Sequence, residues 1–290
     1  MPTQTSSSQP VPFDASSAWG KYAASGWQAM LIKCCHALPA SSQLAYSINK
    51  GLRGPVKSGT PRYMDADVLG LRLRLLSRGN YCETTALFAP QFYDPIEMNW
   101  LRQALTDESV FVDVGGNVGL YSLIAAKHNP SAQVVTIEPE TSLLERMQFN
   151  AESNNLKIHA ANTALSDYEG TGLLDTDRGQ SGQNQLVGTE AVSAQVTAED
   201  SGKREVKVTT LPQLCQSLDI KHIDIMKIDI EGHEHRVLQH FVENAPKELF
   251  PTRIIIEQVH DVNGTVDMLE KNAGYRVMET SKRNALLQRG

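Results

Sequence analysis

Two clusters of polar residues directly follow apolar runs, and they carry side chains whose types and spacing could do chemistry. In the first, VFVDVGGNVG, Asp113 is followed by Gly115, Asn117 and Gly119. Glycines let a backbone turn tightly and approach a ligand, so this run is typical of a cofactor-binding loop. A dinucleotide fingerprint G-x-G-x-x-G would need glycines at 115, 117 and 120, but this chain has Asn117 and Leu120. The spacing therefore disfavours a nicotinamide dinucleotide.

A carboxylate downstream of this loop indicates an adenosine ligand. Glu138 ends the apolar run VVTI, which predicts a second buried strand. A carboxylate at such a strand end can accept hydrogen bonds from both hydroxyls of a ribose. The geometry suits NAD and S-adenosylmethionine (SAM) alike, and a charged residue at a strand end can also have a purely structural role.

The second cluster lies in DIMKIDIEGHE. Lys227, Asp229 and Glu231 alternate with apolar residues, so they share one side of a buried strand near its carboxyl end. Charges there are costly unless they are paired or used, and an ion pair between Lys227 and Asp229 or Glu231 is the structural alternative. Glu257 and His260, at the end of the run IIIEQVH, are further candidates for a general base. A lone histidine near a strand end is more often a surface or hydrogen-bonded residue.

The sequence predicts no metal site. The run HEH at 233–235 lacks the second histidine of H-E-x-x-H, because residue 237 is valine. Asp229, Glu231 and His233 would meet a divalent cation only if the turn folded back, since alternate positions otherwise spread along a strand.

The elements that must position these residues form an α/β alternation from about residue 96. Apolar runs predict strands at 110–114, 133–138, 157–164, 206–208, 223–230 and 253–259. Helical patterns fall at 96–105, 120–128, 142–153, 211–218, 234–242 and 265–273. This alternation predicts a doubly wound, mostly parallel, Rossmann-like sheet, and residues 275–279 and 285–288 add an antiparallel hairpin. Ligands of such sheets bind outside the carboxyl ends of the strands, which is where both polar clusters fall.

Outside this alternation the sequence predicts a head, an extension and an insertion. Residues 1–17 are rich in Ser, Thr, Gln and Pro and are expected to be disordered. Residues 18–95 form an N-terminal extension, with a helix over 18–38 and a strand over 68–76 whose Arg72 and Arg74 are expected on a solvated face. The α/β domain then covers 96–290, with a polar insertion at about 170–203. This insertion, which includes residues 179–184, could be a mobile lid or a surface hairpin without a role in binding.

Composition restricts the expected partners and the compartment. The net charge is -6 and no concentrated face of Lys and Arg is evident, so we expect no nucleic-acid partner. No run reaches the roughly 18 apolar residues of a membrane span, and the N-terminus lacks the pattern of a secretory signal. The four cysteines have no C-x-x-C spacing, which is typical of a reducing compartment. We therefore expect a cytoplasmic protein, of open oligomeric state.

The motifs and their order along the chain resemble those of the FkbM family of SAM-dependent methyltransferases. The matching motifs are DVGGNVGLYS, IEPE with Asn150 and Asn154 downstream, KIDIEGHE, IIIEQVH and a late Gly274-Tyr275. They cover roughly residues 80 to 288. FkbM-type proteins typically read DVGANxG and KIDVEGxE, so Gly116 replaces a common alanine and Ile230 a common valine.

The resemblance implies a class I methyltransferase fold, SAM as the cofactor, and O-methylation of a hydroxyl on a sugar, glycan or secondary metabolite. The residues that it implies for SAM binding are Asp113, Gly115, Asn117, Gly119 and Glu138, with Ser166 or Asp167 near the adenine. The candidate catalytic residues are Asp229, Glu257, His260 and Lys227. An NAD-dependent oxidoreductase and a SAM-binding scaffold without transfer activity are the alternatives.

Overall fold

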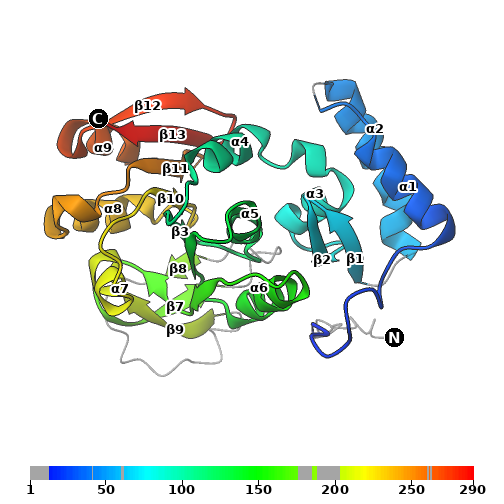
Figure 1. The fold of residues 1–290 in the computed structure, drawn as a ribbon, viewed down its shortest axis with the longest axis horizontal. Coiled ribbons are helices and arrows are strands. Elements are labelled where there is room, and N and C mark those ends of the chain that lie inside the picture. Colours follow the sequence, from blue (N-terminus) through cyan, green and yellow to red (C-terminus); the bar gives the residue numbers. More distant parts are fainter. Residues whose placement is uncertain are drawn as a thin grey trace, which may run out of the picture.

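The computed structural model of the chain describes residues 13–40, 42–59, 62–175, 185–187, 203–259, 261 and 263–290. Within these residues the strands form a central seven-stranded sheet, a four-stranded sheet below it and a separate two-stranded sheet near the N-terminus. Figure 1 shows the central sheet flanked by helices, with the N-terminal elements to one side.

The central sheet confirms the doubly wound fold that the β/α alternation predicts. Its strand order is β12-β13-β11-β10-β3-β4-β5. The strands are β3 (Val110–Val114), β4 (Gln133–Ile137), β5 (His159–Ala161), β10 (Ile225–Ile228), β11 (Arg253–Glu257), β12 (Tyr275–Thr280) and β13 (Asn284–Arg289). The first five pair in parallel, whereas β13 lies antiparallel between β11 and β12. The predicted hairpin is therefore confirmed, and its second strand is the one inserted into the sheet.

Alternating apolar side chains of the strands build two cores, one on each face of this sheet. Phe111, Ile225 and Ile255 belong to the core shared with α5. Val112 and Met226 belong to the core shared with α8 and α9. The helices of the first core are α4 (Pro95–Ala104), α5 (Leu120–His128) and α6 (Thr141–Ser153). The helices of the second core are α7 (Leu211–Ser217), α8 (Glu234–Asn244) and α9 (Thr265–Ala273). All six match the helices that the sequence predicts to within a few residues.

The N-terminal extension differs from its prediction. Its elements are α1 (Gly26–His36), α2 (Gln43–Gly59), β1 (Tyr63–Val68), β2 (Leu71–Leu76), α3 (Tyr81–Phe88) and the short 3-10 helix η1 (Pro90–Phe92). The helix expected from residue 18 begins only at Gly26, because Asp65 accepts hydrogen bonds from the backbone N–H groups of Gly20 and Tyr22 and holds that segment as a turn. The strand expected over 68–76 is a hairpin, since Leu69 and Gly70 both have positive φ and reverse the chain.

The prediction of a solvated Arg74 is wrong. Arg72 is exposed, but Arg74 is fully buried and its guanidinium forms a two-pronged ion pair with Asp65, at 2.7 and 2.9 Å. The same guanidinium donates to the carbonyl oxygens of Asp14, Ser17 and Ala18. We call Arg74, Asp65 and the backbone of residues 14–22 that they bind the N-terminal clip. Alternation along a strand could not reveal it, because the segment that covers Arg74 lies more than 50 residues away.

The region after β5 folds as a second sheet. The predicted third strand divides into β5 and β6 (Ala164–Leu165), and the four strands are ordered β6-β9-β7-β8. The remaining bounds are β7 (Gly170–Asp175), β8 (Gln185–Val187) and β9 (Lys203–Thr209). Residues 179–184, the suggested lid, lie outside the described residues. Among the described helices, none is both long and apolar enough to span a bilayer.

Candidate functional site

A cavity of about 350 Å³ lies at the carboxyl ends of β3, β4 and β10. The strand order reverses at β3, and crevices at such switch points are the usual ligand sites of doubly wound sheets. Its walls come from the loops that follow these three strands, from α3 and η1 of the N-terminal extension, and from the turn before β13. Segments far apart in the sequence therefore share one site.

The glycine loop after β3 forms the floor of this cavity. Gly115 has φ of +71°, and a Cβ atom there would lie 2.0 Å from the carbonyl oxygen of Asp229. Gly119 has φ of +73°, and a Cβ atom there would lie 2.2 Å from Cγ of Met147. Asn117 lies between them with φ of +53°. The loop thus packs closely against the loop after β10 and against α6, as the spacing of the motif requires.

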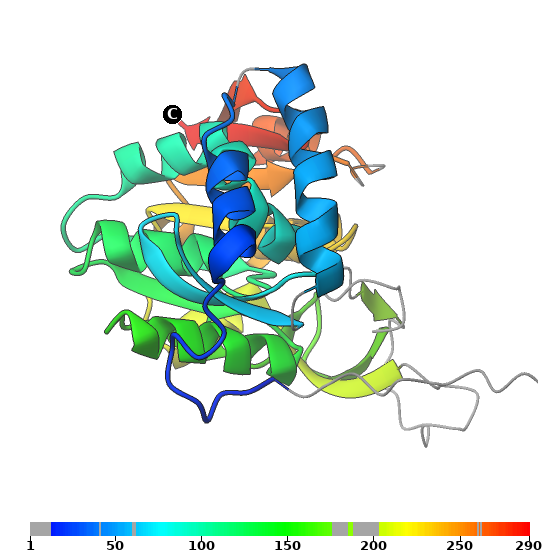
Figure 2. The ribbon, with the colours of Figure 1, turned by 90° about the vertical axis from the view of Figure 1, so that its right-hand side faces the viewer.

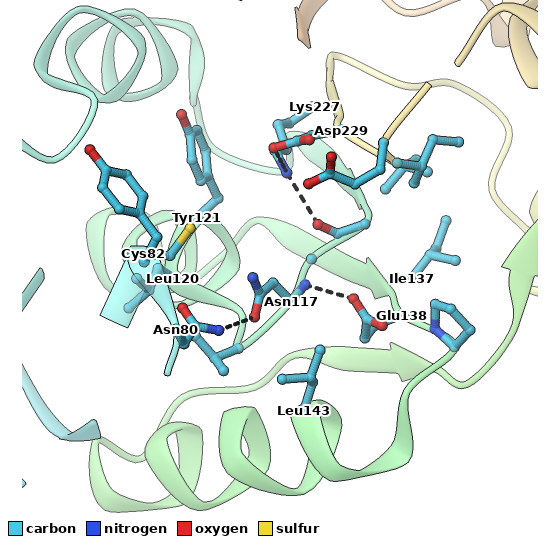
Figure 3. Close-up of a pocket in the computed structure, with 18 of the residues that line it drawn as sticks. Asn80, Cys82, Asn117, Leu120, Tyr121, Ile137, Glu138, Leu143, Lys227 and Asp229 are labelled. Carbon is cyan, nitrogen blue, oxygen red and sulfur yellow. Dashed lines mark hydrogen bonds and ion pairs between the residues drawn. The ribbon is translucent and has the colours of Figure 1, made fainter. Parts of the chain in front are cut away.

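Glu138 faces this loop from the end of β4 (Figure 3). Its Oε2 accepts a hydrogen bond from the backbone N–H of Asn117 at 2.9 Å, and its Oε1 accepts one from the N–H of Glu140 at 2.9 Å. Burial raises the pKa of the carboxyl group to about 7, and these two bonds only partly offset it. Each oxygen keeps a lone pair, so the carboxylate can accept two further hydrogen bonds from a ligand.

Asp113 is buried beneath the loop and does not line the cavity. Its Oδ2 accepts a hydrogen bond from the hydroxyl of Ser122 at 2.7 Å, and its Oδ1 has no hydrogen-bond partner among the described residues. Burial raises the pKa of Asp113, while Lys227 lowers it. Asp113 is therefore placed to support the loop from within the protein.

Ser166 and Asp167, the residues predicted near an adenine, also lie outside the cavity wall. The Ser166 hydroxyl lies 3.0 Å from Nε2 of His233, and Arg236 donates to Asp167 at 2.6 Å. The wall at this place consists of Thr163, Ala164 and Leu165. Of the seven residues implied for the cofactor, those that line the cavity are Gly115, Asn117 and Glu138.

Lys227 lies at the centre of the site as a buried cation. Its Nζ donates to the carbonyl oxygen of Gly115 at 3.1 Å and lies 3.4 Å from Oδ2 of Asp229. Burial would lower the pKa of Lys227, but the carboxylates of Asp229 and Asp113 outweigh it and raise the pKa above its usual value. The structural alternative for Lys227 and Asp229, an ion pair, is therefore present, and Lys227 cannot serve as a base near neutral pH.

Of the other described catalytic candidates, one lines the cavity and one does not. Asp229 lines the cavity, whereas Glu257 is buried behind it and accepts a hydrogen bond from Arg283 at 2.5 Å. Glu234, which the sequence did not single out, accepts from the N–H of Ile230 and thereby fixes the loop after β10. His260 lies outside the described residues.

One acidic cluster has spacing that could hold a divalent cation. Carboxylate oxygens of Asp229, Glu234 and Glu257 lie within 4.8 Å of one another. Arg283 already forms an ion pair with Glu257, and Glu234 accepts a hydrogen bond from the Ile230 N–H. The expectation that the protein uses no metal stays a prediction.

The wall opposite Glu138 was not predicted. It contains Tyr81, Tyr93 and Asp94 from the N-terminal extension, and Arg283 from the turn before β13. The Tyr121 hydroxyl donates to Oδ2 of Asp94 at 2.9 Å, and burial raises the pKa of Asp94. Tyr121 lies within the motif DVGGNVGLYS. The other wall residues named here belong to none of the motifs, so the sequence analysis could not single them out.

Comparisons with known proteins agree with this architecture. Residues 113–277 match the family model of the methyltransferase FkbM domain. The chain is 27% identical to the 31-O-demethyl-FK506 methyltransferase FkbM of Streptomyces tacrolimicus, over 54% of this chain and 67% of that protein. It is 22% identical to the hexuronic acid methyltransferase AglP of Haloferax volcanii, over 55% of this chain and 59% of that protein.

A third relative is much longer. The AMB antimetabolite synthetase AmbE of Pseudomonas aeruginosa is 27% identical over 54% of this chain, and the match spans 9% of that protein. The chain therefore matches only a small part of that synthetase.

Proposed function

The chain belongs to the FkbM methyltransferase family, and from this premise we propose that it transfers a methyl group from SAM to a hydroxyl oxygen of a small molecule or glycan. One observation carries the proposal. Glu138 and the glycine loop line the same cavity as Asp229, Asp94 and several tyrosines, and we assign the part beside Glu138 to the cofactor and the part beside Asp229 and Asp94 to the acceptor. The names of two relatives, which refer to a 31-O-demethyl compound and to a hexuronic acid, support an oxygen acceptor on a small molecule or sugar.

The cofactor end has the groups that SAM requires. SAM supplies an electrophilic methyl group on a sulfonium sulfur. Glu138 would accept hydrogen bonds from the two ribose hydroxyls through the lone pairs that the Asn117 and Glu140 N–H groups leave free. Apolar lining residues next to Glu138 would contact the adenine: Ile137, Pro139, Leu143 and Leu165. SAM has no pyrophosphate, so it does not need the glycine that the dinucleotide fingerprint has at position 117, and Asn117 does not prevent SAM binding.

The acceptor end supports Asp229 as the group that takes the proton. The carboxylate lines the cavity, and its Oδ2 lies 3.4 Å from the ammonium group of Lys227. An ionised carboxylate at this place would accept the proton of a bound hydroxyl group. Because Lys227 stays protonated and Glu257 is paired with Arg283 behind the wall, we assign positioning roles to these two residues. Holding the hydroxyl in line with the methyl group would supply most of the rate.

Calorimetry with S-adenosylhomocysteine (SAH) tests the cofactor. We expect micromolar binding by the wild-type protein and at least about a tenfold loss in Glu138→Ala, because hydrogen bonds to a charged group are removed. Glu145→Ala, which changes an exposed glutamate on α6, is the matched control and should bind normally. Absence of SAH binding by the folded wild-type protein would refute the proposal, and a preference for NADH in the same titration would favour an oxidoreductase.

Turnover distinguishes an enzyme from a binding scaffold. We propose screening glycans and hydroxylated metabolites for the mass gain of one methyl group. With an accepted substrate, Asp229→Asn should lower kcat by about 100-fold or more while SAH affinity changes little, since general-base catalysis typically contributes 10² to 10⁴. An unchanged kcat would remove Asp229 as the base. Nucleic acid is a disfavoured acceptor because of the net charge of -6, and a cytoplasmic location stays a prediction.

A further inference from the structure

The helical hairpin of α1 and α2 differs in charge from the rest of the molecule. Residues 25–59 contain four Lys or Arg residues and no Asp or Glu. The whole chain contains 27 Lys and Arg against 33 Asp and Glu. The hairpin is therefore a cationic segment on an acidic protein.

The same hairpin exposes large apolar side chains. On α1, Trp27 is 51% and Met30 is 60% exposed, and on α2, Leu44 is 70% and Ile48 is 44% exposed. The residues of each pair are three or four positions apart, so each pair forms a ridge along one side of its helix. We call these four side chains the hairpin face. Figure 2 shows α1 and α2 side by side as the outer layer on this side of the molecule.

The hairpin is held firmly on its inner side. Gln91 donates from Nε2 to the carbonyl oxygens of Cys35 and Leu38, and Asn49 donates from Nδ2 to the carbonyl oxygen of Phe88. Buried side chains of both helices complete the contact: Ile32, Cys35, Ala45 and Val56. Since the inner sides are already packed, the hairpin face is free to meet another surface.

We propose that the hairpin face docks on an anionic membrane surface. Interfacial helices of this kind place Trp, Leu and Ile at the headgroup boundary, while Lys and Arg lie beside lipid phosphates. Here Lys33 and Lys50 are exposed on the same two helices as the apolar ridges, and their alkyl stems can lie along lipid while the charges stay at the headgroups. The hairpin face would lie on the membrane without crossing it.

Charge favours a membrane over a second copy of this chain. In a symmetric dimer the same patch faces itself, so Lys33 and Lys50 of one copy would lie near those of the other, with no carboxylate of the hairpin between them. Anionic lipid provides the opposite charge, and its acyl region provides the apolar partner for the four side chains.

Vesicle co-sedimentation of the full chain tests this proposal. We expect the wild-type protein to bind vesicles of equal parts phosphatidylcholine and phosphatidylglycerol, to bind pure phosphatidylcholine at least about tenfold less, and to be released by high salt. Trp27→Ser with Met30→Ser should reduce binding at least about tenfold, and Lys33→Gln with Lys50→Gln should do the same.

Matched controls remove the same groups elsewhere. Val259→Ser with Met278→Ser changes two exposed apolar residues, and Lys127→Gln with Lys157→Gln changes two exposed lysines, outside the hairpin in both cases. These controls should bind vesicles like the wild type, and every variant should keep its SAH affinity and circular dichroism spectrum. Three outcomes would overturn the proposal: no vesicle binding by the wild type, an equal loss in the controls, or a dimer in ultracentrifugation that Trp27→Ser with Met30→Ser dissociates without any lipid effect.

Discussion

At the scale of single residues, the buried carboxyl group of Glu138 links cofactor binding to pH. Burial raises its pKa to about 7, so the free protein binds a proton there in mildly acidic solution. Two ribose hydroxyls donate best to the ionised form, so binding must release this proton. We expect SAH affinity to fall by about tenfold per pH unit below 7 and to be level above it, measured by calorimetry from pH 5.5 to 8.5.

Glu138→Gln provides the control for this profile. The amide cannot ionise, so the variant should bind SAH more weakly at pH 8 and show no slope between pH 5.5 and 7. The same slope in both proteins would assign the proton to another group.

The side chain of Thr136 restricts which residue can occupy position 116 of the glycine loop. A Cβ atom on Gly116 would lie 2.2 Å from Cγ2 of Thr136, which is fully buried on β4. Gly116→Ala, although it restores the more usual family residue, should therefore lower the free energy of unfolding by about 1–3 kcal/mol. Urea denaturation measures this loss.

The companion substitution Thr136→Ser tests the cause. Serine lacks Cγ2 but keeps the hydroxyl that donates to Ser122 at 2.5 Å, so adding it to Gly116→Ala should recover most of the loss. Purely additive effects of the two substitutions would contradict the proposed clash.

At the scale of elements, the N-terminal clip fixes the start of the described chain to β2. Arg74→Ala would leave Asp65 buried without its cation, and removing one partner of a buried pair typically costs about 3–5 kcal/mol. Arg72→Ala, two positions away on the same strand but exposed, should cost less than about 1 kcal/mol. Equal unfolding midpoints of the two variants in urea would show that the clip contributes no stability.

The elements that the sequence predicts are those with regular burial. Strands β3, β4, β10 and β11 are buried at almost every position and mostly apolar, and α4 to α9 alternate with the strands of the sheet. Helix α3 was missed because residues 83–88 are all buried, so no polar side marks its period. Helix α2 was missed because Gly51, Gly54 and Pro55 lower its helix propensity.

In the candidate site, too, the residues that the sequence predicts are those next to regular elements. Gly115, Asn117, Glu138 and Asp229 were predicted because each lies in a motif beside a strand end, where the fold itself places ligands. The opposite wall depends on which distant segments pack there. The contact of Asn284 with Glu97, 187 positions apart and 2.7 Å between Nδ2 and Oε1, is of this kind, and no local pattern encodes it.

At the scale of the whole molecule, the cavity joins the N-terminal extension, the central sheet and the turn before β13, so a ligand in it should stabilise them together. At 100 times its Kd, SAH adds about 2.7 kcal/mol to the free energy of unfolding. We expect a single thermal transition that shifts upward by several degrees with SAH, measured by calorimetric scanning. Glu138→Ala should lose most of this shift and Glu145→Ala should keep it, whereas two transitions of which only one moves would show that the extension is energetically separate.

The position of strand β13 also sets the order in which the central sheet can form during synthesis. It lies between β11 and β12, yet all six other strands of the sheet precede it in the sequence. While the ribosome has not yet released residues 284–289, β11 presents an unpaired edge, and such edges are where nascent chains aggregate or recruit chaperones. Synthesis of the parallel strands thus precedes closure of the sheet, and Arg283 and Asn284 arrive at the cavity in the same step. The part of the cavity wall that contains Arg283 and Asn284 should therefore form only after β13 has been synthesised, later than the glycine loop.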